Sequence, residues 1–183
     1  PKADQLLAEN NKLRKTKMSE AIEQVLVLLK PDTVKRGIMG EIISRFEKAG
    51  LKIVAMKMKW VDADKAGRHY GEDIVKRRGE AVRNRLIEFI TSGPVVAMVI
   101  EGVDAVENIR MMVGVTEPKA SLPGTIRGDY SHVSFRHADA KNKAIENILH
   151  ASSSKEDAES EIYLWFNQDE IYDYKTVYEA HTM

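Results

Sequence analysis

The sequence contains no cysteine, and it also lacks long apolar runs and net charge. The absence of cysteine excludes a disulfide framework, a thiolate metal site and a cysteine nucleophile. The longest apolar run, residues 95–100, is far too short to span a bilayer, so we expect no membrane partner. Lysine plus arginine and aspartate plus glutamate both number 28, and this balance argues against a dedicated nucleic-acid-binding chain.

The remaining composition is typical of a folded domain. Of the 183 residues, 43% are hydrophobic and 31% are charged, and a chain of this length buries enough surface to fold without a structural metal. Residues 1–20 are rich in lysine, glutamate and asparagine, and we interpret them as a polar N-terminal arm. Residues 21–183 then form one domain. The polar N-terminus has no signal-peptide core, which favours the cytoplasm.

Hydrophobic spacing predicts an alternation of strands and helices. Strands are predicted at residues 25–29, 51–61, 95–100 and 145–150. Helices are predicted at residues 38–46, around residue 69, at 80–90, at 104–113 and after residue 154, with a long aperiodic loop at 116–130. On a four-stranded antiparallel sheet with right-handed crossovers, this order predicts an α+β fold, a ferredoxin-like split βαβ sandwich with helices packed on the sheet.

Helix ends carry recognisable signals. Asp62 or Asp64 is expected to cap the helix around residue 69, and Ser153 or Ser154 the last helix. Asp104 resembles the start of a capping box.

Common catalytic motifs are absent, including the Walker phosphate loop, G-x-G-x-x-G, H-E-x-x-H and G-x-S-x-G. Histidine remains as a candidate nucleophile, because an imidazole with a pKa near 6.5 is largely unprotonated at neutral pH. His69 is interpreted as a helix-surface residue, whereas His150 ends a predicted strand. The following helix carries Glu161, whose carboxylate can bond one imidazole nitrogen and orient the other. Ordinary capping and a solvated acidic face explain these residues equally well.

Three cations stand near predicted strand or helix ends. Lys30 follows a buried strand directly and therefore lies close to the end of the sheet. Arg127 lies in a glycine-flanked loop, where it can bind a phosphate or simply be a surface residue of a turn. Arg110 lies near the end of a predicted helix, where interaction with the helix dipole is the alternative role.

Eight motifs, in order and spanning residues 23–174, resemble the nucleoside diphosphate kinase family. They are Leu28-Leu29-Lys30-Pro31-Asp32, Arg36-Gly37-x-x-Gly40-Glu41-Ile42, His69-Tyr70, Ser-Gly-Pro-Val-Val-Ala-Met-Val at 92–99, Arg110-x-x-x-Gly114-x-Thr116-x-Pro118, Pro-Gly-Thr-Ile-Arg-Gly-Asp at 123–129, Asn147-Ile148-Leu149-His150 and Ala158-Glu159-x-Glu161-Ile162. The stretch at 123–129 and the Asn-x-x-His element are together highly specific.

The resemblance implies transfer of the γ-phosphoryl group from a nucleoside triphosphate to a nucleoside diphosphate, in a ping-pong reaction through a phosphohistidine. It implies that Mg²⁺ is held mainly by the nucleotide phosphates and that the chain forms a homo-oligomer, a hexamer first, with a tetramer or dimer as alternatives. His150 matches the nucleophile, and Glu161 and Ser152 match groups that hold it. The nucleotide-contacting positions match Lys30, Tyr70, Arg110, Thr116, Arg127 and Asn147.

Three features depart from the family. The region that supplies a base-stacking phenylalanine contains Val82, which offers an apolar wall without a π-face. Ala151 stands where glycine is usual, and the polar stretch at residues 131–146 is longer than usual. These changes bear on base affinity and assembly rather than on phosphoryl chemistry.

Two alternatives come from other functional classes. One is a nucleotide-binding regulatory homologue with weak or no turnover, against which the intact set of cations and His150 argues. The other is a ferredoxin-like RNA-binding module, which needs aromatic side chains on the sheet. The clearest predicted strand, residues 95–100, has none.

Overall fold

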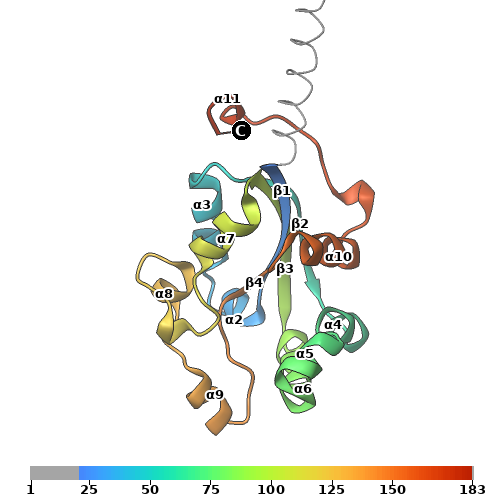
Figure 1. Ribbon diagram of the computed structural model, residues 1–183, viewed down its shortest axis with the longest axis vertical. Helices are drawn as coiled ribbons and strands as arrows, with labels where there is room; N and C mark the ends of the chain where they lie inside the picture. The colour runs from blue at the N-terminus through green and yellow to red at the C-terminus, as the bar shows by residue number, and fades with distance from the viewer. Residues whose placement is uncertain (1–20, 183) are drawn as a thin grey trace, which may run out of the picture.

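A computed structural model describes residues 21–182 and contains one four-stranded antiparallel sheet in the order β2-β3-β1-β4. The strands are β1 (Ile22–Leu29), β2 (Lys52–Trp60), β3 (Pro94–Val103) and β4 (Leu149–Ala151). Figure 1 shows helices on both faces of this sheet. The expected α+β, ferredoxin-like sandwich is confirmed. The predicted arm at residues 1–20 lies outside the described residues.

The helices follow the predicted order, with additions. They are α2 (Pro31–Lys35), α3 (Met39–Lys48), α4 (Ala63–His69), α5 (Glu72–Arg78), α6 (Glu80–Thr91), α7 (Ala105–Val113), α8 (Ile126–Tyr130), α9 (Phe135–Ala140), α10 (Lys155–Trp165) and α11 (Glu179–Thr182), with 3₁₀ turns η1 (Pro118–Ala120) and η2 (Gln168–Glu170). None of the described helices is long and apolar enough to cross a membrane.

The core consists of two layers separated by the sheet. Side chains of β1 alternate between them: Val25, Val27 and Leu29 pack with α3 and α7, and Leu26 and Leu28 pack with α4, α6 and α10. Residues 25–29 of this interior strand are fully buried on both faces, which explains why they form a continuous apolar run. The residues that directly follow the carboxyl end of β1 are therefore held by a rigid, buried strand.

Local capping signals are partly correct. Asp62 and Ser154 accept hydrogen bonds from backbone N–H groups in the first turns of α4 and α10, as expected. The capping box at Asp104 is wrong, because this residue adopts a left-handed conformation (φ +46°) and its side chain makes no cap bond. The Glu23 carboxylate accepts the N–H of Val106 instead, over 3.0 Å.

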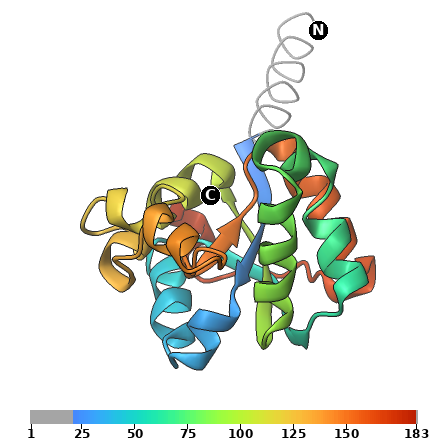
Figure 2. The ribbon, with the colours of Figure 1, turned by 90° about the horizontal axis from the view of Figure 1, so that it is seen from below.

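Two predicted segments differ from the structure. The last strand covers Leu149–Ala151 rather than residues 145–150, because the residues before it form a tight turn. The aperiodic loop at 116–130 contains η1 and α8, and the extended stretch at 131–146 contains α9. Both segments lie on the same side of the molecule (Figures 1 and 2).

Candidate active site

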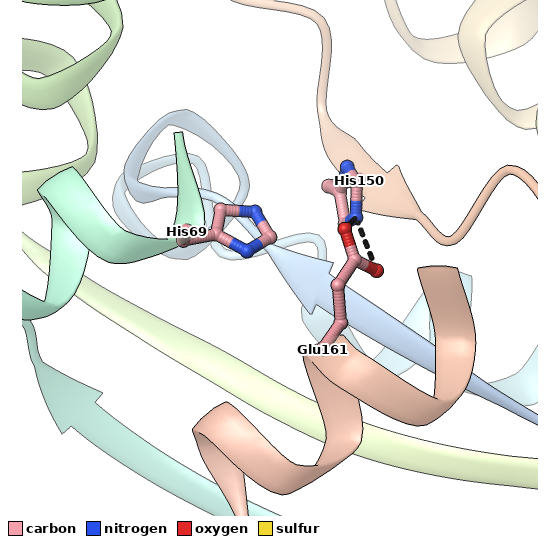
Figure 3. A group of neighbouring side chains, drawn as sticks. All are labelled: His69, His150 and Glu161. Atoms are coloured by element: carbon pink, nitrogen blue, oxygen red, sulfur yellow. Dashed lines mark hydrogen bonds and ion pairs between the residues drawn. The ribbon is translucent and has the colours of Figure 1, made fainter. Parts of the chain in front are cut away.

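His150 lies on β4, paired with Leu28 of the buried central strand. Its Nε2 is 2.8 Å from one carboxylate oxygen of Glu161 and 3.0 Å from the other. In Figure 3 the second ring nitrogen, Nδ1, lies on the opposite side of the ring from Glu161. A neutral imidazole that donates its proton from Nε2 carries its lone pair on Nδ1. The contact with Glu161 therefore occupies Nε2 and leaves the lone pair of Nδ1 available.

Glu161 is itself held from behind. The hydroxyl of Ser152 donates to Glu161 Oε2 over 2.6 Å and accepts the backbone N–H of Leu26 over 3.2 Å. Ser152 is fully buried, so the end of this chain of hydrogen bonds behind Glu161 lies out of contact with solvent. The imidazole is thus oriented by the central strand through two intermediate side chains.

A strained turn precedes His150 by two residues. Ile148 has a φ of +76°, and the N–H of Leu149 donates to the carbonyl of Asn147 over 2.9 Å, which defines a γ-turn. The conformation is over-determined, because the N–H of Ile148 donates to Asp32 over 2.9 Å and its carbonyl accepts the N–H of Lys30 over 3.0 Å. Such strain is characteristic of functional sites.

Lys30 is a buried cation at the end of β1. Its ammonium donates to Asn147 Oδ1 over 2.6 Å, and the Asn147 amide donates to the carbonyl of Thr116 over 2.8 Å. Burial, followed by repulsion from Arg127, lowers the pKa of Lys30 to about 8, although Asp32 opposes the shift. An anion that binds nearby restores the protonated state.

Arg127 is fixed by three backbone carbonyls. Its guanidinium donates to Asn147 over 3.1 Å, to Gly114 over 3.0 Å and to Leu149 over 2.7 Å. Burial, followed by the charge of Arg110, lowers the pKa of Arg127 to about 10. Three of the five N–H donors are thereby used, and the rest remain for a ligand.

A cavity of about 1710 Å³ brings nearly all the predicted site residues together. Its walls include Lys30, Tyr70, Val82, Arg110, Thr116, Arg127, Asn147, His150 and Glu161. Ser152 does not line the cavity and instead lies behind Glu161. Burial raises the pKa of Tyr70, so its hydroxyl is protonated. The hydroxyl is buried and has no hydrogen-bond partner among the described residues, so it can donate to a ligand in the cavity.

Sequence reasoning misassigned His69. Rather than lying on the helix surface, it packs edge-on against His150, with 4.7 Å between ring centres, and its Nδ1 accepts the indole N–H of Trp165 over 3.3 Å. Burial, followed by the proximity of His150 and Lys30, holds the pKa of His69 well below its usual value, so the ring is neutral. Its packing depends on Trp165, which is 96 residues away, and no local signal indicates that contact.

His69, His150 and Glu161 also offer ligand atoms within 4.8 Å of one another (Figure 3). Two imidazoles and one carboxylate suit Zn²⁺ better than Mg²⁺, which prefers oxygen. Glu161 is already committed to Ser152 and to His150. We therefore interpret the cluster as a support for the His150 ring, in which Glu161 hydrogen-bonds the ring and His69 packs against it.

Comparison with protein families matches residues 23–171 to the model of "Nucleoside diphosphate kinase". A nucleoside diphosphate kinase of Borreliella burgdorferi is 48% identical over 155 residues, which is 84% of this chain and 93% of that protein. One from Pyrococcus furiosus is 53% identical over 153 residues, covering 84% of this chain and 88% of the relative.

Solved structures resemble the fold as well. The transition-state mimic of the Borrelia burgdorferi nucleoside-diphosphate kinase, with bound vanadate and ADP, has a TM-score of 0.88 and is 46% identical, covering 89% of this chain and 98% of that one. The halophilic enzyme from Halobacterium salinarum, in complex with CDP, has a TM-score of 0.74 and is 38% identical, covering 86% of this chain and 96% of that one.

Proposed function

The chain belongs to the nucleoside diphosphate kinase family, and we propose that His150 Nδ1 is the atom that carries the phosphoryl group. The reaction transfers the γ-phosphoryl group from a nucleoside triphosphate to a nucleoside diphosphate by a ping-pong mechanism through a phosphohistidine. The observation that carries the atomic assignment is the pair of contacts from Glu161 to Nε2, which leaves Nδ1 unbonded in the cavity wall.

In the first half-reaction, the Nδ1 lone pair attacks the γ-phosphorus in line with the leaving β-phosphate oxygen. The N–P bond forms as the P–O bond breaks, and the nucleoside diphosphate leaves with the bonding electrons. In the second half-reaction, a β-phosphate oxygen of an acceptor attacks the same phosphorus and the N–P bond breaks. The proton on Nε2 stays between His150 and Glu161 throughout, so no proton must leave the site.

Positive charge provides most of the catalysis in this scheme. Lys30, Arg110 and Arg127 surround the phosphates and stabilise charge on the equatorial oxygens. The Tyr70 hydroxyl donates to a phosphate oxygen, and Thr116 contacts the nucleotide beside Asn147. Asn147 positions the Lys30 ammonium.

We propose that the nucleotide enters as its Mg²⁺ complex. The carboxylate beside the nucleophile, Glu161, already bonds two side chains, so the phosphates rather than the protein hold the ion. When bound, Mg²⁺ neutralises charge on the transferred and leaving groups. A regulatory homologue with weak turnover is not favoured, because the cations and the oriented imidazole occupy one cavity.

We further propose self-association, a hexamer first, with a tetramer or dimer as alternatives. Supporting this, β2 is an outer strand on which Met56, Met58 and Trp60 are 56%, 56% and 66% exposed. Three large apolar side chains at alternate positions of an outer strand favour contact with another copy. We also propose that the protein acts in the cytoplasm, where both nucleotide substrates are abundant.

Labelling with γ-³²P-ATP tests the central proposal. After removal of nucleotide, the protein should retain acid-labile, alkali-stable label and should pass it to an added unlabelled diphosphate. His150→Ala should abolish labelling. His132→Ala, which removes an exposed imidazole outside the cavity, should not change it. Equal labelling of the His150→Ala variant would refute the assignment.

A further inference from the structure

The extended stretch at residues 131–146 reaches across the cavity. Its helix α9 makes two side-chain contacts with the α5–α6 pair on the other side. The Arg78 guanidinium lies 4.8 Å from the centre of the Phe135 ring, and Arg85 pairs with Asp139 over 3.2 Å. Figure 1 places α9 at the same end of the molecule as α5 and α6.

The near end of this stretch is anchored to the opposite wall. The N–H of Phe135 donates to the Glu117 carboxylate over 2.8 Å, and the N–H of Lys119 donates to the carbonyl of Val133 over 3.1 Å. Ser134 caps α9 by accepting the N–H of His137 over 3.2 Å. The base of α9 is therefore tied to η1, while its far side rests on α5 and α6, so the helix bridges the two walls.

The contacts that close this bridge are weak. Arg78 and Asp139 are solvent-exposed, and an exposed cation–π contact or ion pair contributes little stability. The backbone anchors at Glu117 and Lys119 are independent of these two contacts. The N-terminal end of α9, with Phe135, is thus fixed by backbone hydrogen bonds, whereas its C-terminal end is tied to α6 by the exposed carboxylate of Asp139.

The cavity wall formed by α6 and α9 differs chemically from the end that contains His150. It includes the apolar side chains of Val82, Leu86, Phe135 and Ala138, beside the charged Arg78, Arg85 and Asp139. Among the described lining residues, Phe135 is the only phenylalanine, and the other aromatic side chains, His69, Tyr70 and His150, are grouped together around His69. Here too, the buried Nε of Arg85 lacks a hydrogen-bond acceptor among the described residues.

We propose that Phe135 is the base-binding residue of this chain, stacking on the nucleobase. This inference rests on the proposed function, which fixes the triphosphate at His150 and so directs the base away from it. Arg78 lies over the Phe135 ring and the residue lines the cavity, so in this proposal the base stacks on the ring face opposite Arg78. Val82 then forms the opposing apolar wall, and Arg85 supplies an N–H donor to a base carbonyl.

Stacking of a base on an aromatic ring is lost when the ring is removed, whereas phosphate contacts are not. We therefore compare two donors in single-turnover labelling of His150: Mg²⁺–ATP and inorganic triphosphate, which has no base. Phe135→Leu and Phe135→Ala should raise the half-saturating ATP concentration about tenfold. Both variants should leave the half-saturating concentration of triphosphate within twofold of the unsubstituted chain.

His137→Ala is the matched control, because His137 lies on the same helix, is exposed and does not line the cavity. It should change neither donor. The inference is overturned if Phe135→Leu binds ATP within twofold of the unsubstituted chain, or if both donors weaken equally. Failure of the proposed function looks different, because the unsubstituted chain would then accept label from neither donor. Phe135→Leu keeps an apolar side chain, so it serves as the test if the alanine variant unfolds.

Discussion

Replacing Glu161 with glutamine removes the negative charge beside His150 but keeps a side chain of nearly the same size. The carboxylate oxygens lie 2.8 and 3.0 Å from Nε2, within hydrogen-bond range. Hydrogen bonds to a charged group contribute about 1.5–3 kcal/mol and neutral ones about 0.5–1.5 kcal/mol. The charge itself is therefore worth about 1–1.5 kcal/mol, or roughly a tenfold change in rate.

This loss should appear in one kinetic parameter. The imidazole gains positive charge as the N–P bond forms, so the carboxylate stabilises the transition state more than the bound nucleotide. Glu161→Gln should lower kcat about tenfold and leave the ATP KM within twofold.

Rapid-quench measurement of phosphohistidine formation checks this expectation. Glu159→Gln is the matched control, because Glu159 is an exposed acid on the same helix and should have no effect. A Glu161→Gln rate within twofold of the unsubstituted chain would refute the reasoning, as would an equal loss in Glu159→Gln.

Three further predictions concern charge and assembly. Because burial lowers the pKa of Lys30 from 10.5 to about 8, kcat/KM should fall above pH 8. Between pH 8 and 10.5 the unfolded chain binds more protons at Lys30 than the folded chain, so the Lys30 contribution to stability should rise with pH as activity falls. A kcat/KM profile that is level to pH 9.5 would contradict this. Arg127→Met should lower the free energy of unfolding in urea by about 3 kcal/mol, because three carbonyls lose their donor. Arg110→Met, at an exposed site, should stay within about 0.5 kcal/mol while also losing activity, and equal destabilisation would count against the distinction. Met58→Glu places a charge on the exposed outer strand, and light scattering should then show a smaller assembly than for the unsubstituted chain; an unchanged mass would exclude this surface as an interface.

Local patterns predict the parts of the fold that local forces determine. The apolar run at residues 95–100 lies within β3, and Asp62 and Ser154 cap the helices that follow them, because these signals act within a few residues. The left-handed Asp104 escaped prediction, since Glu23 from another element satisfies the helix N-terminus. The short β4 escaped it for a similar reason: Asp32 on α2 fixes the turn that precedes the strand.

The candidate site shows the same division. Residues of the specific motifs, such as Lys30, Arg127 and His150, line one cavity and were all expected there. Phe135 was not expected to line the cavity, because it lies in a polar stretch without periodicity. It does so because α9 packs against α5 and α6. Long-range packing that no short window contains accounts for the residues that were missed.

The γ-turn at Ile148 has a lasting effect on how the enzyme works. The unfavourable backbone angle of Ile148 is adopted when the chain folds, so its energetic cost is part of the folding free energy and is not repeated at each turnover. The imidazole is consequently held in one orientation without a nucleotide in the cavity. The strained turn therefore costs the fold about 1–3 kcal/mol of stability, and what it provides in return is a fixed position for His150.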